Sequence, residues 1–312
     1  MVAGCGGVGA ALVRPLVRVP YRPVTSGAMT VKRVGIVGSG IMGSGLAEVC
    51  AKAGYEVAVR SRAQSSADAL VAGFEKSLAR QVDKGRLEVA DRDQILGRVR
   101  AVTDLAELAE CDLVLESIVE DLATKKHLFN ELDRICGEQT LLATNTSTLP
   151  VIELAMETGR PERVCGIHFF NPAPAMALVE VVRAITTSDE TVATALAFAE
   201  ACGKQAVQVR DQAGFIVNAL LFPYLNNAVR MLDAGVATRD DIDAAMKGGC
   251  NFPMGPLALL DLVGLDTSLS ILEALYAEFR DPNYAPAPLL SRMVSAERLG
   301  RKTRQGFYDY RS

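Results

Sequence analysis

Short apolar runs alternate with amphipathic segments over the first two thirds of the chain of 312 residues. Apolar runs rich in β-branched residues predict buried strands, and apolar positions repeating every three or four residues predict helices. We expect strands at 31–37, 55–59, 111–118, 140–147, 163–170, 177–183 and 204–210. Helices are expected at 44–54, through roughly 65–98, and at 125–136. This alternation predicts an α/β fold with an open, mostly parallel, doubly wound sheet.

The pattern changes after Arg210, where no further strand is predicted. Residues 213–235 have helical periodicity, with Pro223 predicting a kink. Thr238 followed by Asp241 predicts a helix start, and two more helices are expected at 257–262 and 267–280. We therefore predict two domains: residues 29–210 and an all-helical domain at 211–312. The apolar faces of the second domain predict a homodimer formed through these helices.

Residues 1–28 contain Arg14, Arg18 and Arg22 but no acidic residue. This composition is typical of a transit peptide. The competing interpretation, which we favour, is a translation start assigned too early, with Met29 as the true first residue. Both interpretations place this segment outside the folded part of the chain.

Composition excludes several classes of function. With 49% hydrophobic residues, 22% charged residues and a net charge of −4, nothing indicates a nucleic-acid partner, and no apolar run is long enough to cross a membrane. The seven cysteines form no CxxC pair and only two histidines are present. We therefore expect no metal site, and reduced thiols in a cytoplasmic protein.

A glycine-rich turn follows the first predicted strand. The sequence GCGGVG at 4–9 also fits G-x-G-x-x-G, but no strand can precede it. The second match lies between a strand and a helix, which is the context of a Rossmann dinucleotide site. Its residues are Gly38, Ser39, Gly40, Ile41, Met42 and Gly43. Free N–H groups at the helix start would bind a pyrophosphate, so we predict an NAD- or NADP-dependent dehydrogenase.

The end of the second strand should reveal the choice of cofactor. An acidic residue at this point usually binds the ribose hydroxyls of NAD. This chain has Arg60, Ser61 and Arg62 instead, and two guanidinium groups could bind the 2′-phosphate of NADP. NADP is therefore slightly favoured, while two solvated arginines beside the adenosine of NAD remain the alternative.

Hydride transfer from an alcohol also requires a base. His168 ends a predicted strand, where α/β active sites form, whereas His127 lies on the outer face of a helix. Glu180 lies twelve residues after His168 in an apolar strand, where a carboxylate is costly unless it has a partner. A hydrogen bond between the two would satisfy Glu180 and orient the imidazole.

At this stage the sequence resembles the L-3-hydroxyacyl-CoA dehydrogenases, especially the short bacterial 3-hydroxybutyryl-CoA dehydrogenases. The resemblance extends over residues 31–310 and rests on seven ordered motifs. They are GSGIMG (38–43), NTST (145–148), HFFNP (168–172), GFIVN (214–218), PMGP (253–256), GLD (264–266) and GFYDY (306–310). It implies an acyl-CoA substrate, with the helical domain covering the thioester and closing on the sheet domain.

The resemblance also implies roles for individual residues. His168 would be the general base, Glu180 its partner, Ser147 a hydrogen-bond donor to the reacting oxygen or the thioester, and Asn218 a ligand of substrate or His168. Positions near the nicotinamide half of the cofactor are Glu120, Lys125, Asn145, Ser147, Asn171 and Lys302. Ser77 and Lys84 match positions that contact coenzyme A, and Arg80 one turn before Lys84 would add positive charge.

Two departures from the family pattern stand out. Ser61 replaces the acidic ribose-binding residue, and Arg304 stands where the family has glycine. Alternatives also remain open at this stage. One is a dehydrogenase acting on free β-hydroxy acids. Others are an enzyme of the gulonate dehydrogenase and lambda-crystallin branch, and a non-catalytic NAD(P)-binding protein.

Overall fold

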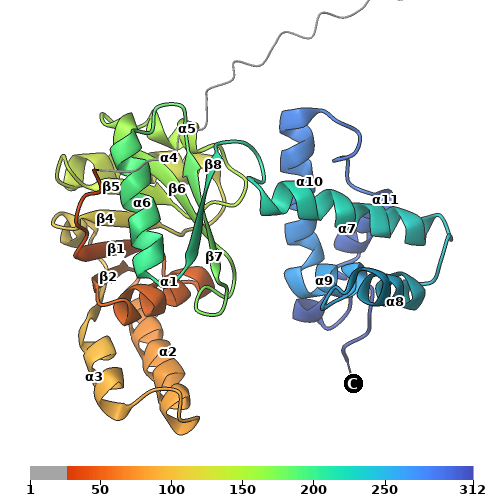
Figure 1. Cartoon of the computed structure of the whole chain (residues 1–312), viewed down its shortest axis with the longest axis horizontal. Helices are drawn as coiled ribbons and strands as arrows, with labels where there is room; N and C mark the ends of the chain where they lie inside the picture. The colour runs from red at the N-terminus through yellow and green to blue at the C-terminus, as the bar shows by residue number, and fades with distance from the viewer. Residues whose placement is uncertain (1–26, 312) are drawn as a thin grey trace, which may run out of the picture.

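A computed structural model of the chain describes residues 27–311. Residues 1–26 lie outside this range. They include the glycine-rich sequence at 4–9 and most of the segment interpreted as a transit peptide or as the result of an early translation start. Two bodies lie side by side: an α/β domain and a smaller all-helical domain (Figure 1). The predicted fold class is confirmed.

The α/β domain is built on an eight-stranded sheet with the order β3-β2-β1-β4-β5-β6-β7-β8. β6 and β7 are antiparallel, whereas the other neighbouring strands are parallel. The strands are β1 (Arg33–Val37), β2 (Glu56–Arg60), β3 (Val99–Val102), β4 (Leu113–Glu116), β5 (Leu141–Thr144), β6 (Val164–Phe169), β7 (Leu178–Arg183) and β8 (Gln205–Arg210). The sequence pattern missed β3, because this edge strand has only four residues and Arg100 in it is exposed.

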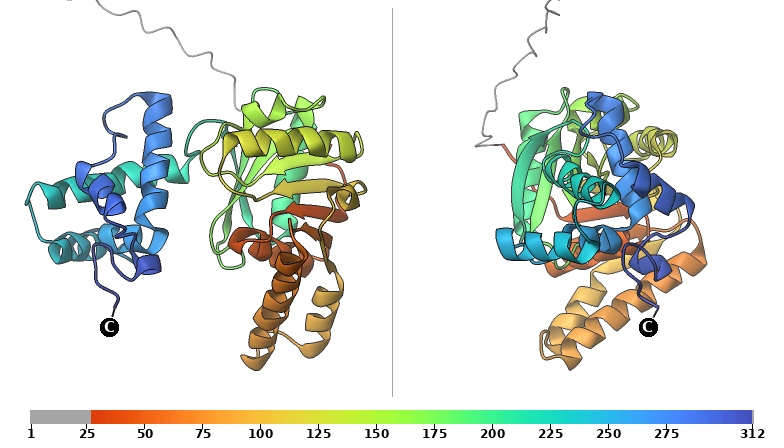
Figure 2. Two further views of the ribbon diagram at one scale, coloured as in Figure 1. Left: turned by 180° about the vertical axis from the view of Figure 1, so that it is seen from behind. Right: turned by 90° about the vertical axis from the view of Figure 1, so that its right-hand side faces the viewer.

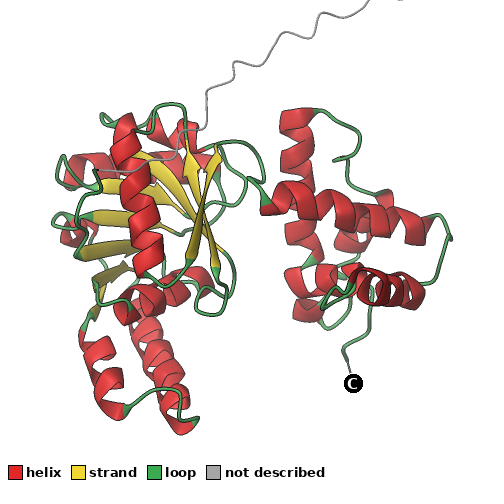
Figure 3. Ribbon diagram, in the orientation of Figure 1, coloured by secondary structure: helices red, strands yellow, loops and turns green. Residues whose placement is uncertain are grey.

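Helices cover both faces of the sheet (Figures 2 and 3). They are α1 (Ile41–Lys52), α2 (Gln64–Asp83), α3 (Val89–Gly97), α4 (Leu122–Ile135), α5 (Val151–Ala155) and α6 (Asp189–Ala201). Buried side chains of α1, α2, α3 and α6 pack on one face, and those of α4 and α5 on the other. Strands covered on both sides explain why their sequences are almost continuously apolar.

The second domain has its own hydrophobic core. Its helices are α7 (Val217–Asp233), α8 (Arg239–Cys250), α9 (Pro256–Val263), α10 (Leu265–Phe279) and α11 (Pro288–Ser295). α7 continues through Pro223, and Thr238 accepts a hydrogen bond from the N–H of Asp241 at the start of α8, as predicted. Within residues 27–311, no helix has the length and apolar character needed to span a membrane.

Arg304, the residue that departs from the family glycine, has a φ of +57° at the end of a short 3-10 helix. Only glycine adopts this left-handed conformation without steric cost, which gives a physical reason for glycine at this position. The arginine is exposed, so the departure alters a surface turn.

Candidate functional site

The carboxyl ends of β4, β5 and β6 meet at one edge of the sheet, because these strands are parallel. His168 is the second-last residue of β6, and β7 returns antiparallel to it. His168 and Glu180 are direct partners in the register of this pair. The strand reversal therefore places a carboxylate of β7 beside the imidazole of β6.

The imidazole of His168 is held at both nitrogens. Nδ1 lies 2.8 Å from Oε2 of Glu180, and Nε2 lies 3.0 Å from Oγ of Ser147. A carboxylate can only accept, so Nδ1 carries a proton and Nε2 is left as the acceptor in the neutral ring. His168 is 3% exposed and Glu180 is fully buried. The predicted pair exists, and its basic nitrogen, Nε2, is hydrogen-bonded to the hydroxyl of Ser147.

Glu180 also contacts the start of the second domain. Its Oε1 accepts hydrogen bonds from the backbone N–H groups of Ile216 (3.0 Å) and Val217 (2.9 Å), where α7 begins. Three donors thus satisfy this buried carboxylate, which removes most of the cost of its burial. Asn218 follows in the first turn of α7 and is 8% exposed. Its amide makes no hydrogen bond to another residue of the described part of the chain, His168 included.

A second network holds the loop that carries Ser147. Oε1 of Glu120 accepts the N–H of Ser147 at 2.9 Å and the hydroxyl of Thr146 at 2.5 Å. Burial alone would raise the pKa of Glu120, but the charge of Lys125 and the hydrogen bonds outweigh it and leave this pKa below its ordinary value. The position of Ser147 therefore depends on Glu120.

Lys125, which was predicted to lie beside the cofactor, is deeply buried. It is 1% exposed, and its Nζ lies 2.6 Å from Glu116 and 3.1 Å from Glu120. Glu116 ends β4, is fully buried, and also accepts the hydroxyl of Thr144 and the N–H of Ile118. Glu116 is a buried residue of this site that the sequence-based predictions did not include. The signal was present, because Glu116 is an acidic residue in an apolar strand, as Glu180 is.

The other predicted nicotinamide-side residues are dispersed. Oδ1 of Asn145 accepts the N–H of Phe169 at 2.8 Å and so connects the ends of β5 and β6. Asn171 is exposed in the loop after β6. Lys302 lies in the second domain, where it pairs with Asp266. The structure thus groups Asn145 with His168 but keeps Lys302 on the other domain.

The glycine turn has the shape that a dinucleotide requires. A Cβ on Gly38 would lie 2.3 Å from the carbonyl oxygen of Ser117, and one on Gly43 would lie 1.9 Å from that of Gly38. A Cβ on Gly40 would meet nothing within 4 Å, so this side is open. α1 has no side-chain cap and no acidic residue in its first turn, and Ile41 is 81% exposed there. The free N–H groups of this helix start fit a pyrophosphate.

The end of β2 differs from the sequence-based expectation in one respect. Arg62 is exposed, and Arg60 donates from Nε to the carbonyl oxygen of Thr103 at 3.1 Å. Ser61 is only 1% exposed, and its hydroxyl is buried with no hydrogen-bond partner among the described residues. The two arginines therefore remain candidates for binding a phosphate, whereas Ser61 would reach one only after a local rearrangement.

The residues expected to contact coenzyme A lie on α2, which projects from the sheet beside α3 (Figure 3). Oγ of Ser77 donates to Glu48 of α1 at 3.0 Å, so this hydroxyl is directed toward the neighbouring helix. Lys84 is the C-cap residue directly after α2 and is exposed, as is Arg80. The basic pair is thus available to a ligand, while Ser77 is engaged within the domain.

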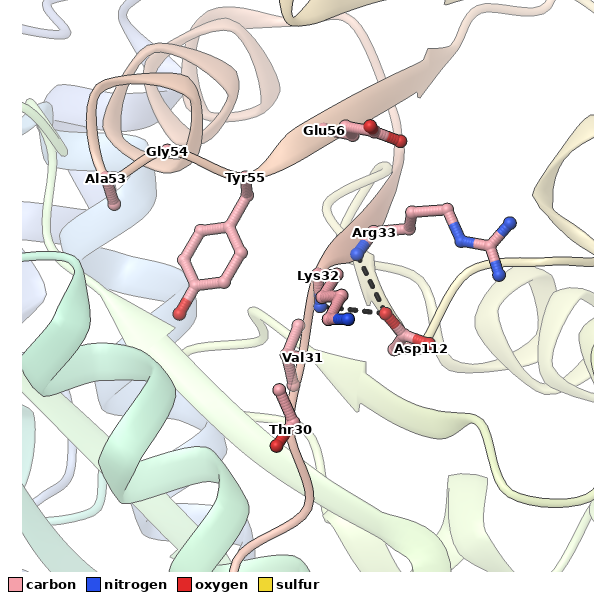
Figure 4. A pocket seen from close by; sticks show the side chains of 9 residues that line it. All are labelled: Thr30, Val31, Lys32, Arg33, Ala53, Gly54, Tyr55, Glu56 and Asp112. Atoms are coloured by element: carbon pink, nitrogen blue, oxygen red, sulfur yellow. Dashed lines mark hydrogen bonds between the residues drawn. The ribbon is translucent and has the colours of Figure 1, made fainter.

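A pocket of about 960 Å³ lies at the opposite edge of the sheet (Figure 4). It surrounds the amino ends of β1 and β2, where Asp112 accepts the backbone N–H groups of Lys32 and Arg33, each at 2.8 Å. The lining residues are Thr30, Val31, Lys32, Arg33, Ala53, Gly54, Tyr55, Glu56 and Asp112. None of them belongs to the edge that holds His168. In the described residues, no group of three or more His, Cys, Asp or Glu could hold a metal ion.

Comparisons with known proteins agree with this arrangement. Residues 33–212 match the NAD-binding domain of 3-hydroxyacyl-CoA dehydrogenase, and residues 214–310 match its C-terminal domain. A 3-hydroxybutyryl-CoA dehydrogenase of Mycobacterium tuberculosis is 48% identical over 282 residues, covering 90% of this chain and 99% of that protein. One from Clostridioides difficile is 46% identical over 278 residues, covering 89% and 99%.

A solved structure gives the same result. The crystal structure of (S)-3-hydroxybutyryl-CoA dehydrogenase from Ralstonia eutropha superimposes with a TM-score of 0.88 at 42% identity, covering 91% of this chain and 100% of that one. These similarities favour the 3-hydroxyacyl-CoA dehydrogenases over the gulonate dehydrogenase and lambda-crystallin branch. With its two matched domains, the chain belongs to the 3-hydroxyacyl-CoA dehydrogenase family.

Proposed function

We propose that this enzyme catalyses reversible hydride transfer between C3 of 3-hydroxybutyryl-CoA and a nicotinamide cofactor. The observation that carries the proposal is the chain of hydrogen bonds from Glu180 through His168 to Ser147, at the sheet edge where parallel strands end. The names of the similar proteins support this substrate.

His168 is the general base in this proposal. The bound cofactor would accept the hydride that leaves C3. Nε2 of His168 takes the proton of the 3-hydroxyl, and Glu180 stabilises the imidazolium through Nδ1–H. In the reverse direction the imidazolium returns the proton. Ser147, 3.0 Å from Nε2, is placed to donate to the same substrate oxygen.

Residues around this centre would orient the ligands. The unbonded amide of Asn218, in the first turn of α7, is proposed to hold the substrate when the domains close. The proposed cofactor residues are Gly38, Ser39, Gly40, Ile41, Met42 and Gly43 at the pyrophosphate, with Glu120, Lys125, Asn145, Ser147, Asn171 and Lys302 toward the nicotinamide. For coenzyme A we propose Lys84 and, after its release from Glu48, Ser77.

Initial rates with acetoacetyl-CoA and the reduced cofactor test the function. We expect saturable turnover that fails when free acetoacetate replaces the thioester, because the CoA portion supplies binding energy for the reaction. Turnover of free 3-oxo acids at equal efficiency would contradict the substrate class. Tight cofactor binding without any turnover would instead indicate a non-catalytic protein.

We further propose that NADP is accepted, with Arg60 and Arg62 binding the 2′-phosphate. Support comes from the absence of a carboxylate at positions 60–62 and from the exposure of Arg62. The double variant Arg60→Ala, Arg62→Ala should raise KM for NADPH by about tenfold or more and change KM for NADH little. Arg33→Ala, at the opposite edge of the sheet, is the control. Equal effects on both cofactors would contradict the proposal and leave NAD as the cofactor.

We also propose a homodimer in the cytoplasm. Large apolar side chains are exposed on the helical domain, among them Leu220 (74%), Val236 (65%) and Leu262 (49%). We propose that these side chains belong to one contiguous patch, because contiguous apolar patches mark interfaces. Light scattering should give twice the mass of the chain, and Leu220→Glu should shift it toward the monomer. A wild-type monomer would contradict the dimer.

A further inference from the structure

The connector between β8 and α7 leads from the α/β domain to the helical domain (Figure 1), and its residues pack alternately against the two. After β8 ends at Arg210, Ala213 packs in the core of the helical domain and donates its N–H to Glu278 of α10 at 2.9 Å. Gly214 is so close to α10 that a Cβ on it would lie 2.8 Å from Leu275. At residues 213–214 the chain therefore belongs to the second domain.

At Phe215 the chain returns to the α/β domain. Its side chain is 2% exposed and packs in the core of the α/β domain, with residues of the sheet and of α4. Its φ is +50°, in the left-handed region that bulky residues rarely occupy. Such a conformation persists only where the surrounding structure holds it. Here the next two N–H groups, of Ile216 and Val217, bond to Glu180 and hold the backbone.

The ring of Phe215 lies against the catalytic base. Its centroid is 5.4 Å from that of His168, with the planes inclined at 59°. Phe170 contacts the same imidazole, with centroids 4.5 Å apart and an inclination of 55°. Hydrogen bonds hold the two nitrogens of His168, and aromatic rings restrict rotation of the imidazole. The ring of Phe215 thus contacts His168, and the two N–H groups that follow it in the chain bond to Glu180, the partner of His168.

We propose that Phe215 is a positioning residue, which fixes the imidazole of His168 against Glu180 through its ring and its left-handed backbone. The proposal rests on the proposed role of His168 as the base. A misplacement of about 1 Å in a reacting group can lower the rate roughly 10²-fold. Loss of the Phe215 ring should therefore slow the chemical step more than it weakens substrate binding.

Phe215→Leu tests this proposal, with Phe215→Met as a variant of more nearly conserved volume. The matched control is Phe129→Leu, because Phe129 is also fully buried in the same core but lies on α4. We expect kcat to fall by about 10- to 100-fold in both Phe215 variants, with KM for both substrates within about threefold of wild type. The pH profile of kcat/KM, which reports the protonation of the essential base, should differ from that of wild type. Phe129→Leu should lower Tm but keep kcat and the pH profile.

A second measurement does not depend on turnover. The chain has only two histidines, so the 15N imidazole resonances of His168 and His127 can be followed individually. These shifts report the tautomer and hydrogen bonding of each ring. In the Phe215 variants the His168 nitrogens should shift, while those of His127, whose side chain is 78% exposed, should not.

Three results would overturn the proposal. They are equal losses of kcat in Phe215→Leu and Phe129→Leu, an unchanged pH profile with unchanged His168 resonances, and failure of both Phe215 variants to fold while Phe129→Leu folds. Absence of wild-type turnover with acetoacetyl-CoA would count against the proposed function instead. The histidine resonances would still test the contact between Phe215 and His168 in that case.

Discussion

Glu116 and Glu180 are both fully buried at the same edge of the sheet, and each accepts three hydrogen bonds. Their partners differ. Glu116 pairs with Lys125, which is itself enclosed, whereas Glu180 bonds an imidazole whose second nitrogen faces Ser147. The first pair extends only to another carboxylate, Glu120, whereas the second ends in Nε2 of His168, a nitrogen that can accept a proton. Burial of a carboxylate therefore does not identify a catalytic site. A partner with a second atom that can accept a proton, as Nε2 of His168 can, indicates one.

The largest expected effect is at Nε2 of His168. His168→Ala should lower kcat by roughly 10²–10⁴-fold, because the proton acceptor is removed. The dissociation constant of the cofactor should hardly change, since the glycine turn lies between β1 and α1, away from His168 on β6. Steady-state rates and cofactor titration by fluorescence measure the two quantities. Near-normal turnover would show that the imidazole is not the base. The difference drawn between the Glu180–His168 pair and the Glu116–Lys125 pair would then be wrong.

Glu180→Gln should produce the next largest effect. The amide has one acceptor oxygen for three donors, so either Nδ1–H of His168 or the N–H groups at the start of α7 lose their partner. We expect kcat to fall on the order of 10²-fold, since the imidazolium is no longer stabilised. The unfolding free energy should also fall by about 1–3 kcal/mol. Loss of stability without loss of kcat would assign Glu180 the same role as Glu116.

Glu116→Gln should show the opposite balance. It leaves the buried ammonium of Lys125 with only Glu120 as counter-charge, and broken buried pairs cost about 3 kcal/mol or more. The loss should be visible in chemical denaturation, while kcat of the folded protein should fall far less than in Glu180→Gln. The double variant Glu116→Leu, Lys125→Met should recover much of the stability. A loss of kcat equal to that of Glu180→Gln would make both pairs catalytic.

Glu116, Glu180 and Phe215 also show how much of the site could be predicted from the sequence. Strands buried on both faces, the glycine turn and the pairing of His168 with Glu180 follow from local patterns and from the rule that a buried carboxylate needs a partner. Glu116 carries the same signal in the sequence, and the same rule predicts a buried partner for it. The ring of Phe215 against His168 could not be predicted, because it depends on a connector that leaves one domain and returns to it. The same limit applies to Ser77, whose bond to Glu48 depends on how α2 packs against α1.

The smallest effect should be that of Glu120, which is 40% exposed and whose pKa lies below its ordinary value. A carboxyl whose folded-state pKa is depressed stabilises the fold above its unfolded pKa, and this contribution is lost as the pH falls through the folded-state value. Glu120→Gln should therefore lower the unfolding free energy at neutral pH by less than about 1 kcal/mol, because solvent screens a half-exposed group. The difference from wild type should shrink as the pH falls below about 4.

Urea denaturation across this pH range measures the effect. Glu138→Gln is the matched control, because Glu138 is an exposed carboxylate outside the Lys125 network. A difference between Glu120→Gln and wild type that stays constant with pH would mean that Glu120 acts through hydrogen bonds alone. If the difference fades with acid while kcat falls at every pH, Glu120 both stabilises the fold by its charge and places Ser147. Glu120 would then connect the structural pair of Glu116 and Lys125 to the reactive pair of Glu180 and His168, through Lys125 on one side and Ser147 on the other.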